Sequence, residues 1–230
     1  MLIYQNIKSA QFISRPNRFI AIVELDGRQE VCHVKNTGRC KELLNPGVTV
    51  FVQESDNPSR KTKYDLIGVM KGNRPVNIDS QVPNKIFSEL ISEGKLFSNV
   101  ILVKPEVKYG NSRFDFYIET EEDKIFVEVK GVTLEENNVA LFPDAPTDRG
   151  VKHIKELIEC AEKGYKAYIV FIIQMKGVSS FTPNAVRHKE FAEALSLAAH
   201  NNVNVLAFDC NVGQDFIEIN EKVEVKLYDF

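Results

Sequence analysis

The residues with the clearest chemical potential lie in one stretch, SRFDFYIETEEDKIFVEVKG, which runs from Ser112 to Gly131. Its alternation of apolar and polar residues predicts a β-hairpin that turns at residues 121–122. With that turn, Asp115 and Glu128 face each other, and the Cβ atoms of such partners lie about 5 Å apart. Lys130 projects from the same side of its strand as Glu128. Two carboxylates and a lysine on one face can hold a hard divalent cation and activate a water for phosphodiester hydrolysis.

Each residue of this trio has an expected role. Asp115 and Glu128 would bind Mg2+, with Mn2+ as an alternative ion, while Lys130 would orient or deprotonate the attacking water. Glu106, on the preceding strand, is a candidate outer metal ligand, and an ordinary surface glutamate is the equally weighted alternative. The opposite face of the hairpin is expected to be wholly apolar and to pack on a helix; its residues are Phe114, Phe116, Ile118, Ile125, Val127 and Val129.

The pattern Glu-x-Lys is weak evidence by itself, because it occurs five times in the chain. The most serious competitor is the C-terminal segment in which Asp215 precedes Glu224-Val225-Lys226. We interpret that segment as an exposed edge hairpin whose charges protect it from pairing with other chains.

A second set of polar residues begins the helix predicted from about Arg149 to Lys163. Thr147 or Asp148 is a suitable N-cap. Arg149 and His153 are four residues apart and therefore share one stripe, with Lys152 beside them. These three side chains are candidate contacts to the scissile phosphate, and a capped helix with a solvated basic flank remains an open alternative.

The first third of the chain has the alternation of β-structure, with five candidate strands at residues 7–14, 19–25, 31–34, 48–53 and 66–70. A short helix is expected between Asn36 and Gly47, capped by Asn36 or Thr37. Five strands with such a helix between the third and the fourth fit an OB-like barrel. We place the domain boundary near Gly72-Asn73-Arg74-Pro75, giving domains at residues 1–76 and 77–230.

Basic residues in the barrel are candidate DNA contacts. They are Arg15, Arg18, Arg39, Lys41, Arg60, Lys61 and Lys63. Residues 1–79 hold 12 basic and 8 acidic residues, whereas the remaining residues hold 17 basic and 24 acidic ones, within a total net charge of −3. Phe12, Phe19 and Phe51 are candidate platforms for base stacking, although aromatic residues in small barrels more often belong to the core.

Composition sets the broad class. With 43% apolar and 27% charged residues, the chain is typical of a globular protein, and no stretch is long enough to span a bilayer. The N-terminal residues lack the features of a signal peptide, so we expect a cytoplasmic protein without membrane partners. The four cysteines match no zinc spacing and are expected to be reduced and mostly buried.

After residue 84 the predicted order is helix, three strands, helix, strand, helix, strand. That order, with D-x12-E-x-K on its second and third strands, resembles the PD-(D/E)xK, restriction-endonuclease-like core. Four blocks, HVKNTGRCKELLNPG, VKYGNSRFDFYI, EVKGVTL and FPDAPTDRGVKHIKEL, resemble the sugar fermentation stimulation protein (SfsA) family over nearly the whole chain. The resemblance implies an OB-like five-stranded barrel followed by a restriction-endonuclease-like mixed sheet flanked by helices, an α/β fold with an all-β N-terminal domain.

The resemblance also implies DNA binding without marked sequence preference and a regulatory effect on sugar metabolism. Two functions therefore remain open. One is a DNA-binding protein whose nuclease-like Mg2+ site turns over slowly or not at all. The other is a Mg2+-dependent DNA endonuclease or structure-specific nuclease that uses Asp115, Glu128 and Lys130. DNA is the expected partner in both, and a homodimer is an open alternative for the assembly.

Overall fold

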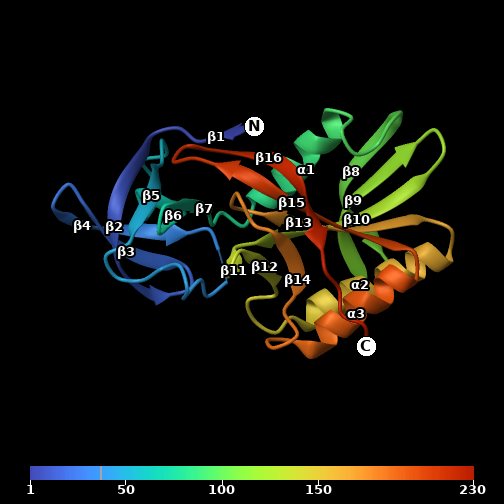
Figure 1. The fold of residues 1–230 in the computed structure, drawn as a ribbon. Coiled ribbons are helices and arrows are strands. Elements are labelled where there is room, and N and C mark those ends of the chain that lie inside the picture. Colours follow the sequence, from blue (N-terminus) through green and yellow to red (C-terminus); the bar gives the residue numbers. More distant parts are fainter. Residues whose placement is uncertain (37) are drawn as a thin grey trace.

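The computed structural model describes residues 1–36 and 38–230, and these form two β-units that lie side by side (Figure 1). The first unit is a sheet in the order β4-β3-β2-β5-β6-β7. Its strands are β2 (Ile7–Asn17), β3 (Ile20–Leu25), β4 (Arg28–Val34), β5 (Thr49–Glu54), β6 (Tyr64–Lys71) and β7 (Arg74–Asn77). Parallel pairing of β4 with β6 closes the first five strands into a barrel, which confirms the OB-like prediction.

One local prediction in this unit is wrong. The segment from Gly38 to Gly47 contains turns rather than a helix, and Thr37, one of the two proposed caps, lies outside the described residues. Gly72-Asn73, near which we placed the domain boundary, forms the turn of a hairpin between β6 and β7. Gly72 has a φ of 59°, a left-handed conformation that glycine adopts without steric cost. The chain therefore adds a sixth strand before it leaves the barrel.

The second unit is a mixed sheet in the order β11-β12-β14-β16-β15-β13-β10-β9-β8, with β1 (Leu2–Ile3) paired to β16. The other strands are β8 (Val100–Tyr109), β9 (Ser112–Thr120), β10 (Lys124–Val132), β11 (Leu134–Glu136), β12 (Val139–Phe142), β13 (Lys166–Ile173), β14 (Ser180–Pro183), β15 (Val203–Val212) and β16 (Phe216–Val225). At its centre, β10, β13 and β15 run parallel. Apolar residues fill β13 because both faces of that strand are covered.

The described residues of this unit include three helices, α1 (Val82–Ser92), α2 (Asp148–Glu162) and α3 (Lys189–His200). Apolar residues of α1, such as Phe87, pack with Phe116 on one face of the sheet. Helices α2 and α3 lie beside each other and pack with the apolar cluster that contains Phe114 and Phe171 (Figure 1). The sheet is thus covered on both faces, as the restriction-endonuclease-like prediction requires.

The prediction for the C-terminal strand differs most from the observed topology. The sequence suggested an exposed edge hairpin, but β16 lies between β14 and β15 and pairs with both. Its charged residues do not mark an edge of the sheet. The short strands β11, β12 and β14 were also missed, because each is only three or four residues long.

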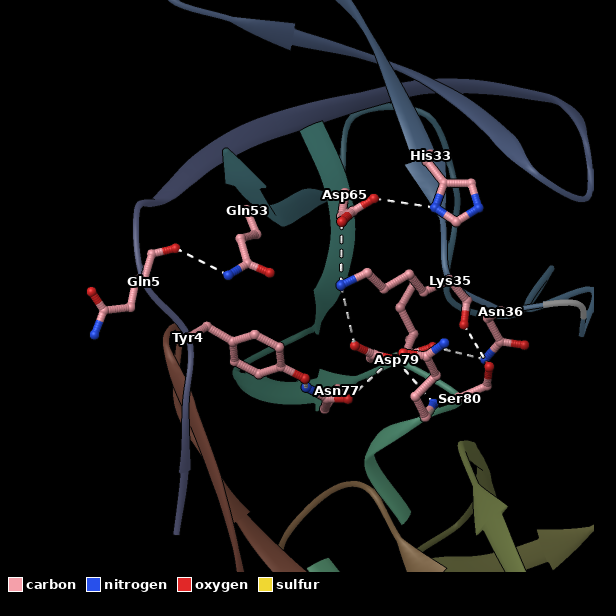
Figure 2. A network of polar contacts seen from close by, with 12 residues as sticks. Tyr4, Gln5, His33, Lys35, Asn36, Gln53, Asp65, Asn77, Asp79 and Ser80 are labelled. Atoms are coloured by element: carbon pink, nitrogen blue, oxygen red, sulfur yellow. Dashed lines mark hydrogen bonds and ion pairs between the residues drawn. The ribbon is translucent and has the colours of Figure 1, made fainter. Parts of the chain in front are cut away.

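A buried polar network joins the two units (Figure 2). The ammonium of Lys35 lies between two carboxylates, 3.2 Å from Asp65 of the barrel and 3.7 Å from Asp79 in the connection to α1. From the second unit, Gln174 donates to Asn77 Oδ1 at 2.9 Å and to the carbonyl of Asp79 at 3.0 Å. Buried polar groups satisfied in this way fix the orientation of the elements that carry them.

All four cysteines are buried and free, as predicted. In the part of the chain that the structure describes, no helix is both long and apolar enough to cross a membrane.

Candidate metal centre

Asp115 and Glu128 lie directly beyond the last described pair of β9 with β10. Residues that sum to 243 are partners, from Lys124 with Glu119 to Val127 with Phe116, as the predicted turn requires. The described pairing ends there, one residue before Asp115. The Asp115 side chain then bonds to β10, where its Oδ2 accepts the backbone N–H of Val129 at 2.8 Å. Its Oδ1 accepts from the amide of Asn84 on α1 at 2.9 Å.

Strand alternation is irregular at this position. Phe116 packs on the α1 side of the sheet, whereas Phe114 packs on the α2 side, where its ring lies 6.2 Å from that of His153. The prediction that Phe114 shares one apolar face with Phe116 is therefore wrong. The two rings occupy opposite faces because β9 leaves its regular pairing between them, at Asp115.

Glu128 lies at the centre of a small polar cluster. Its Oε1 accepts hydrogen bonds from Lys130 Nζ and from Nδ1 of His153, which projects from α2. Side-chain exposure is 3% for Glu128 and 17% for Lys130, so the cluster is largely shielded from water. The second oxygen, Oε2, is buried and has no hydrogen-bond partner among the described residues. A buried carboxylate oxygen without a partner is costly unless a ligand satisfies it.

The two carboxylates have opposite pKa shifts. Burial raises the pKa of Asp115, and the negative charge of Glu128 raises it further, against the hydrogen bonds from Val129 and Asn84. Burial also acts to raise the pKa of Glu128, but the hydrogen bond from His153 and the charge of Lys130 outweigh it and leave this pKa lowered. Glu128 is thus held ionised, and its charge makes the ionised form of Asp115 unfavourable. A cation between the two would relieve that repulsion.

The donor set fits a small hard cation. Carboxylate oxygens are preferred by Mg2+, which keeps several waters instead of demanding an all-protein cage. Among residues 1–36 and 38–230, no group of three or more His, Cys, Asp or Glu side chains converges as a metal site. Asp115 and Glu128 would therefore share the ion with water or phosphate oxygens. Glu106 is not brought to the pair: its side chain is 54% exposed and forms a 2.7 Å ion pair with Arg113.

Helix α2 contributes more to the site than the sequence predicted. Its N-cap is Thr147, whose side chain accepts the N–H of Gly150 at 3.0 Å. From the first turn, Arg149 donates to Nε2 of His153 at 3.3 Å, and His153 continues the chain to Glu128. His153 is buried at the base of the site, whereas Arg149 is exposed. The predicted i, i+4 stripe exists, but only the arrangement of α2 on the sheet reveals that His153 supports the glutamate.

The candidate DNA contacts fall into separate groups. Four of them, Arg15, Arg18, Arg39 and Lys41, line a groove of about 790 Å³ on the barrel, which also contacts Ala145 and Pro146 of the second unit. Arg15 is already occupied, because its guanidinium donates to the backbone carbonyls of Arg18, Asn36, Gly38 and Arg39. Arg15 therefore holds the loop that carries Arg39. The exposed basic side chains of the groove are those of Arg18, Arg39 and Lys41.

The remaining candidates lie elsewhere. On the β5–β6 loop, Arg60 makes two hydrogen bonds to Asp65, at 2.6 and 2.8 Å, and Lys63 lies 2.9 Å from Glu54, while Lys61 is exposed. On α2, Lys152 donates to the carbonyl of Asn111 at 2.8 Å and its side chain is half exposed. Of the three aromatic candidates, Phe12 and Phe51 belong to the core, and Phe19 alone is exposed.

Comparison with known proteins covers nearly the whole chain. Residues 13–78 match the model of the SfsA N-terminal OB domain, and residues 81–216 match the model of the sugar fermentation stimulation protein RE domain. A sugar fermentation stimulation protein homolog from Ruminiclostridium cellulolyticum is 63% identical, and one from Clostridium beijerinckii is 61% identical; each alignment spans 97% of this chain and 99% of the relative. A solved structure described as Pyrococcus furiosus SfsA in complex with Ca2+ is 31% identical, with a TM-score of 0.90 and 98% coverage of both chains.

Proposed function

Because the chain belongs to the sugar fermentation stimulation protein family, we propose that it binds DNA with little sequence preference and holds a Mg2+ ion between Asp115 and Glu128. One observation carries the proposal: Asp115 bonds to the backbone of Val129, the residue after Glu128, and Glu128 has a buried oxygen without a partner among the described residues. The family name connects such a protein with sugar metabolism, and a regulatory role there acting through DNA is part of this proposal.

The basic groove supports the DNA-binding half of the proposal. The side chains of Arg18, Arg39 and Lys41 make no ion pair with any described residue, so their charges are available to phosphates. Binding through phosphates carries no sequence information and weakens steeply as salt rises, because counterions are released. The Ca2+ bound in the Pyrococcus furiosus SfsA complex supports the cation half, since Ca2+ and Mg2+ both select oxygen ligands.

A second candidate function is Mg2+-dependent cleavage of DNA, and the position of Lys130 favours it. When bound, Mg2+ would lower the pKa of its own water and polarise the phosphate. The ammonium of Lys130 lies against Glu128 and is partly exposed, so it can orient a nucleophilic water or offset charge on a phosphate at this spot. His153 holds Glu128 from the opposite, buried side and keeps it ionised.

The test incubates the purified full chain with supercoiled, linear and branched DNA in Mg2+, Mn2+ or EDTA. Asp115→Ala removes the proposed ligand, and Asp215→Ala removes the competing acidic residue near the C-terminus. Metal-dependent cutting that is lost only in Asp115→Ala supports the nuclease. Salt-sensitive binding without cutting supports the DNA-binding protein alone. DNA association that is undetectable or insensitive to salt would reject both functions.

A further inference from the structure

An exposed aromatic side chain lies next to Arg18, one of the residues that line the basic groove of the barrel. Phe19 lies in the turn between β2 and β3 and is 51% exposed. The guanidinium carbon of the neighbouring Arg18, which lines the groove, lies 5.9 Å from the centre of the Phe19 ring. About half of the Phe19 side chain therefore faces solvent beside a basic side chain of the groove.

A second hollow adjoins the groove where the barrel meets the second unit. This second hollow, of about 330 Å³, shares Gly38, Ala145 and Pro146 with the groove, so the two hollows are contiguous. The second hollow is lined further by Thr147, the N-cap of α2, and by Gly131, which directly follows Lys130. Together, the exposed ring of Phe19, the three available basic side chains and the two hollows form one candidate path on the surface.

We propose that this path binds a single unpaired DNA strand, with one base stacked on Phe19. This inference rests on the proposed DNA binding and names its substrate class. A basic groove combined with an aromatic platform is the arrangement that holds single strands, because bases of an unpaired strand are free to stack. Bases within a duplex are already stacked on their neighbours and are not free to stack on a protein side chain.

One acidic residue on the path allows a second test by substitution. Asp144 lines the second hollow, and its carboxylate repels a passing phosphate. Replacing Asp144 with Asn removes that repulsion and is expected to strengthen single-strand binding, most clearly at low salt.

The experiment measures fluorescence anisotropy of labelled oligo-dT of about 16 nucleotides, the upper end of OB-fold site sizes, and of a duplex of equal length. EDTA is present, so binding is read without turnover. The wild-type protein should prefer the single strand. Phe19→Ala should weaken single-strand affinity at least about fivefold while changing duplex affinity little, and Phe19→Tyr should restore it. Phe230→Ala is the matched control, because Phe230 is 64% exposed in the C-terminal tail and is absent from the path.

The outcomes separate this inference from the function on which it rests. Equal effects of Phe19→Ala and Phe230→Ala, or a preference for the duplex, would overturn the single-strand path while leaving DNA binding intact. Absence of binding to either form would overturn both. Circular dichroism of Phe19→Ala checks that the variant is folded, and since Phe19 is half exposed we expect an unchanged spectrum.

Discussion

His153 on α2 and Glu128 on β10 are joined by a hydrogen bond in which both side chains are almost fully buried. The other ring nitrogen of His153, Nε2, accepts a hydrogen bond from Arg149. The ring proton is therefore on Nδ1, which donates a hydrogen bond to the carboxylate. A ligand glutamate held in this way keeps one orientation and stays ionised. Loss of a hydrogen bond that supports a metal ligand commonly lowers metal affinity by about 10- to 100-fold.

Replacing His153 with Ala should weaken divalent-cation binding. Loss of the donor lets burial dominate, so the pKa of Glu128 rises and protons compete with the metal. We expect a 10- to 100-fold loss of Mn2+ affinity near neutral pH, measured by titration calorimetry, with partial recovery at higher pH where Glu128 is ionised again. His200→Ala, on α3, should bind as the wild type does. An affinity unchanged by His153→Ala at every pH would contradict the supporting role.

Asp115→Asn should raise stability while removing metal binding. The folded-state pKa of Asp115 is raised, so its ionisation costs stability as pH rises through that pKa, and a neutral amide avoids this cost. Without metal, the variant is expected to melt at or above the wild-type temperature near pH 7, and the difference should vanish at acid pH. Excess Mg2+ should raise the melting temperature of the wild type alone. A metal-free variant that melts well below the wild type at neutral pH would count against the repulsion between the two carboxylates.

Asp65 should be a main contributor to the stability of the barrel. Burial opposes its ionisation, but the bonds from Arg60 and the charge of Lys35 lower its pKa from 3.8 to about 2. A lowered pKa gives stability that is present above pH 4 and lost as pH falls toward 2, worth about 2 kcal/mol.

Asp65→Asn would leave Arg60 without its charge partner and Lys35 with Asp79 as its one remaining carboxylate among the described residues. We expect urea unfolding near neutral pH to show a loss of about 2 kcal/mol, which shrinks toward pH 2. Asp229→Asn, in the exposed C-terminal tail, serves as the control with no expected change. Unfolding of both variants at the same urea concentration would show that Asp65 does not stabilise the barrel through Arg60 and Lys35.

Gly131 should tolerate no side chain. A Cβ atom there would lie 2.6 Å from Gln174 Oε1 and 2.7 Å from Pro83 Cγ. Gly131→Ala should therefore displace Gln174, which links the second unit to Asn77 and Asp79, and cost about 1–3 kcal/mol. Combining it with Gln174→Ala should cost less than the two single changes together, because the clash is then relieved. Strict additivity in denaturant unfolding would exclude this contact as the cause.

Local patterns in the sequence predicted the parts of the fold that are themselves local. The turn at residues 121–122 fixed the register of β9 and β10, and alternation located the barrel strands. The place of β16 inside the sheet was mispredicted because pairing with β14 and β15 is a long-range choice that its own charges do not reveal.

The candidate site shows the same limit. The predicted turn placed Asp115 opposite Glu128, but the described pairing ends one residue earlier, and the sequence did not reveal the irregularity that sends Phe114 to the other face. The spacing of Arg149 and His153 predicted a shared stripe and left open which of them faces the sheet. Packing of α2 decides this, and it buries His153 against Glu128 while Arg149 stays exposed.

The shared cation is tested most directly by an anomalous difference map from crystals of the full chain grown with Mn2+. We predict a peak about 2 Å from carboxylate oxygens of both Asp115 and Glu128, with Oε2 of Glu128 among them. A well-ordered site without such a peak, or with Mn2+ bound only elsewhere, would contradict the proposed metal centre.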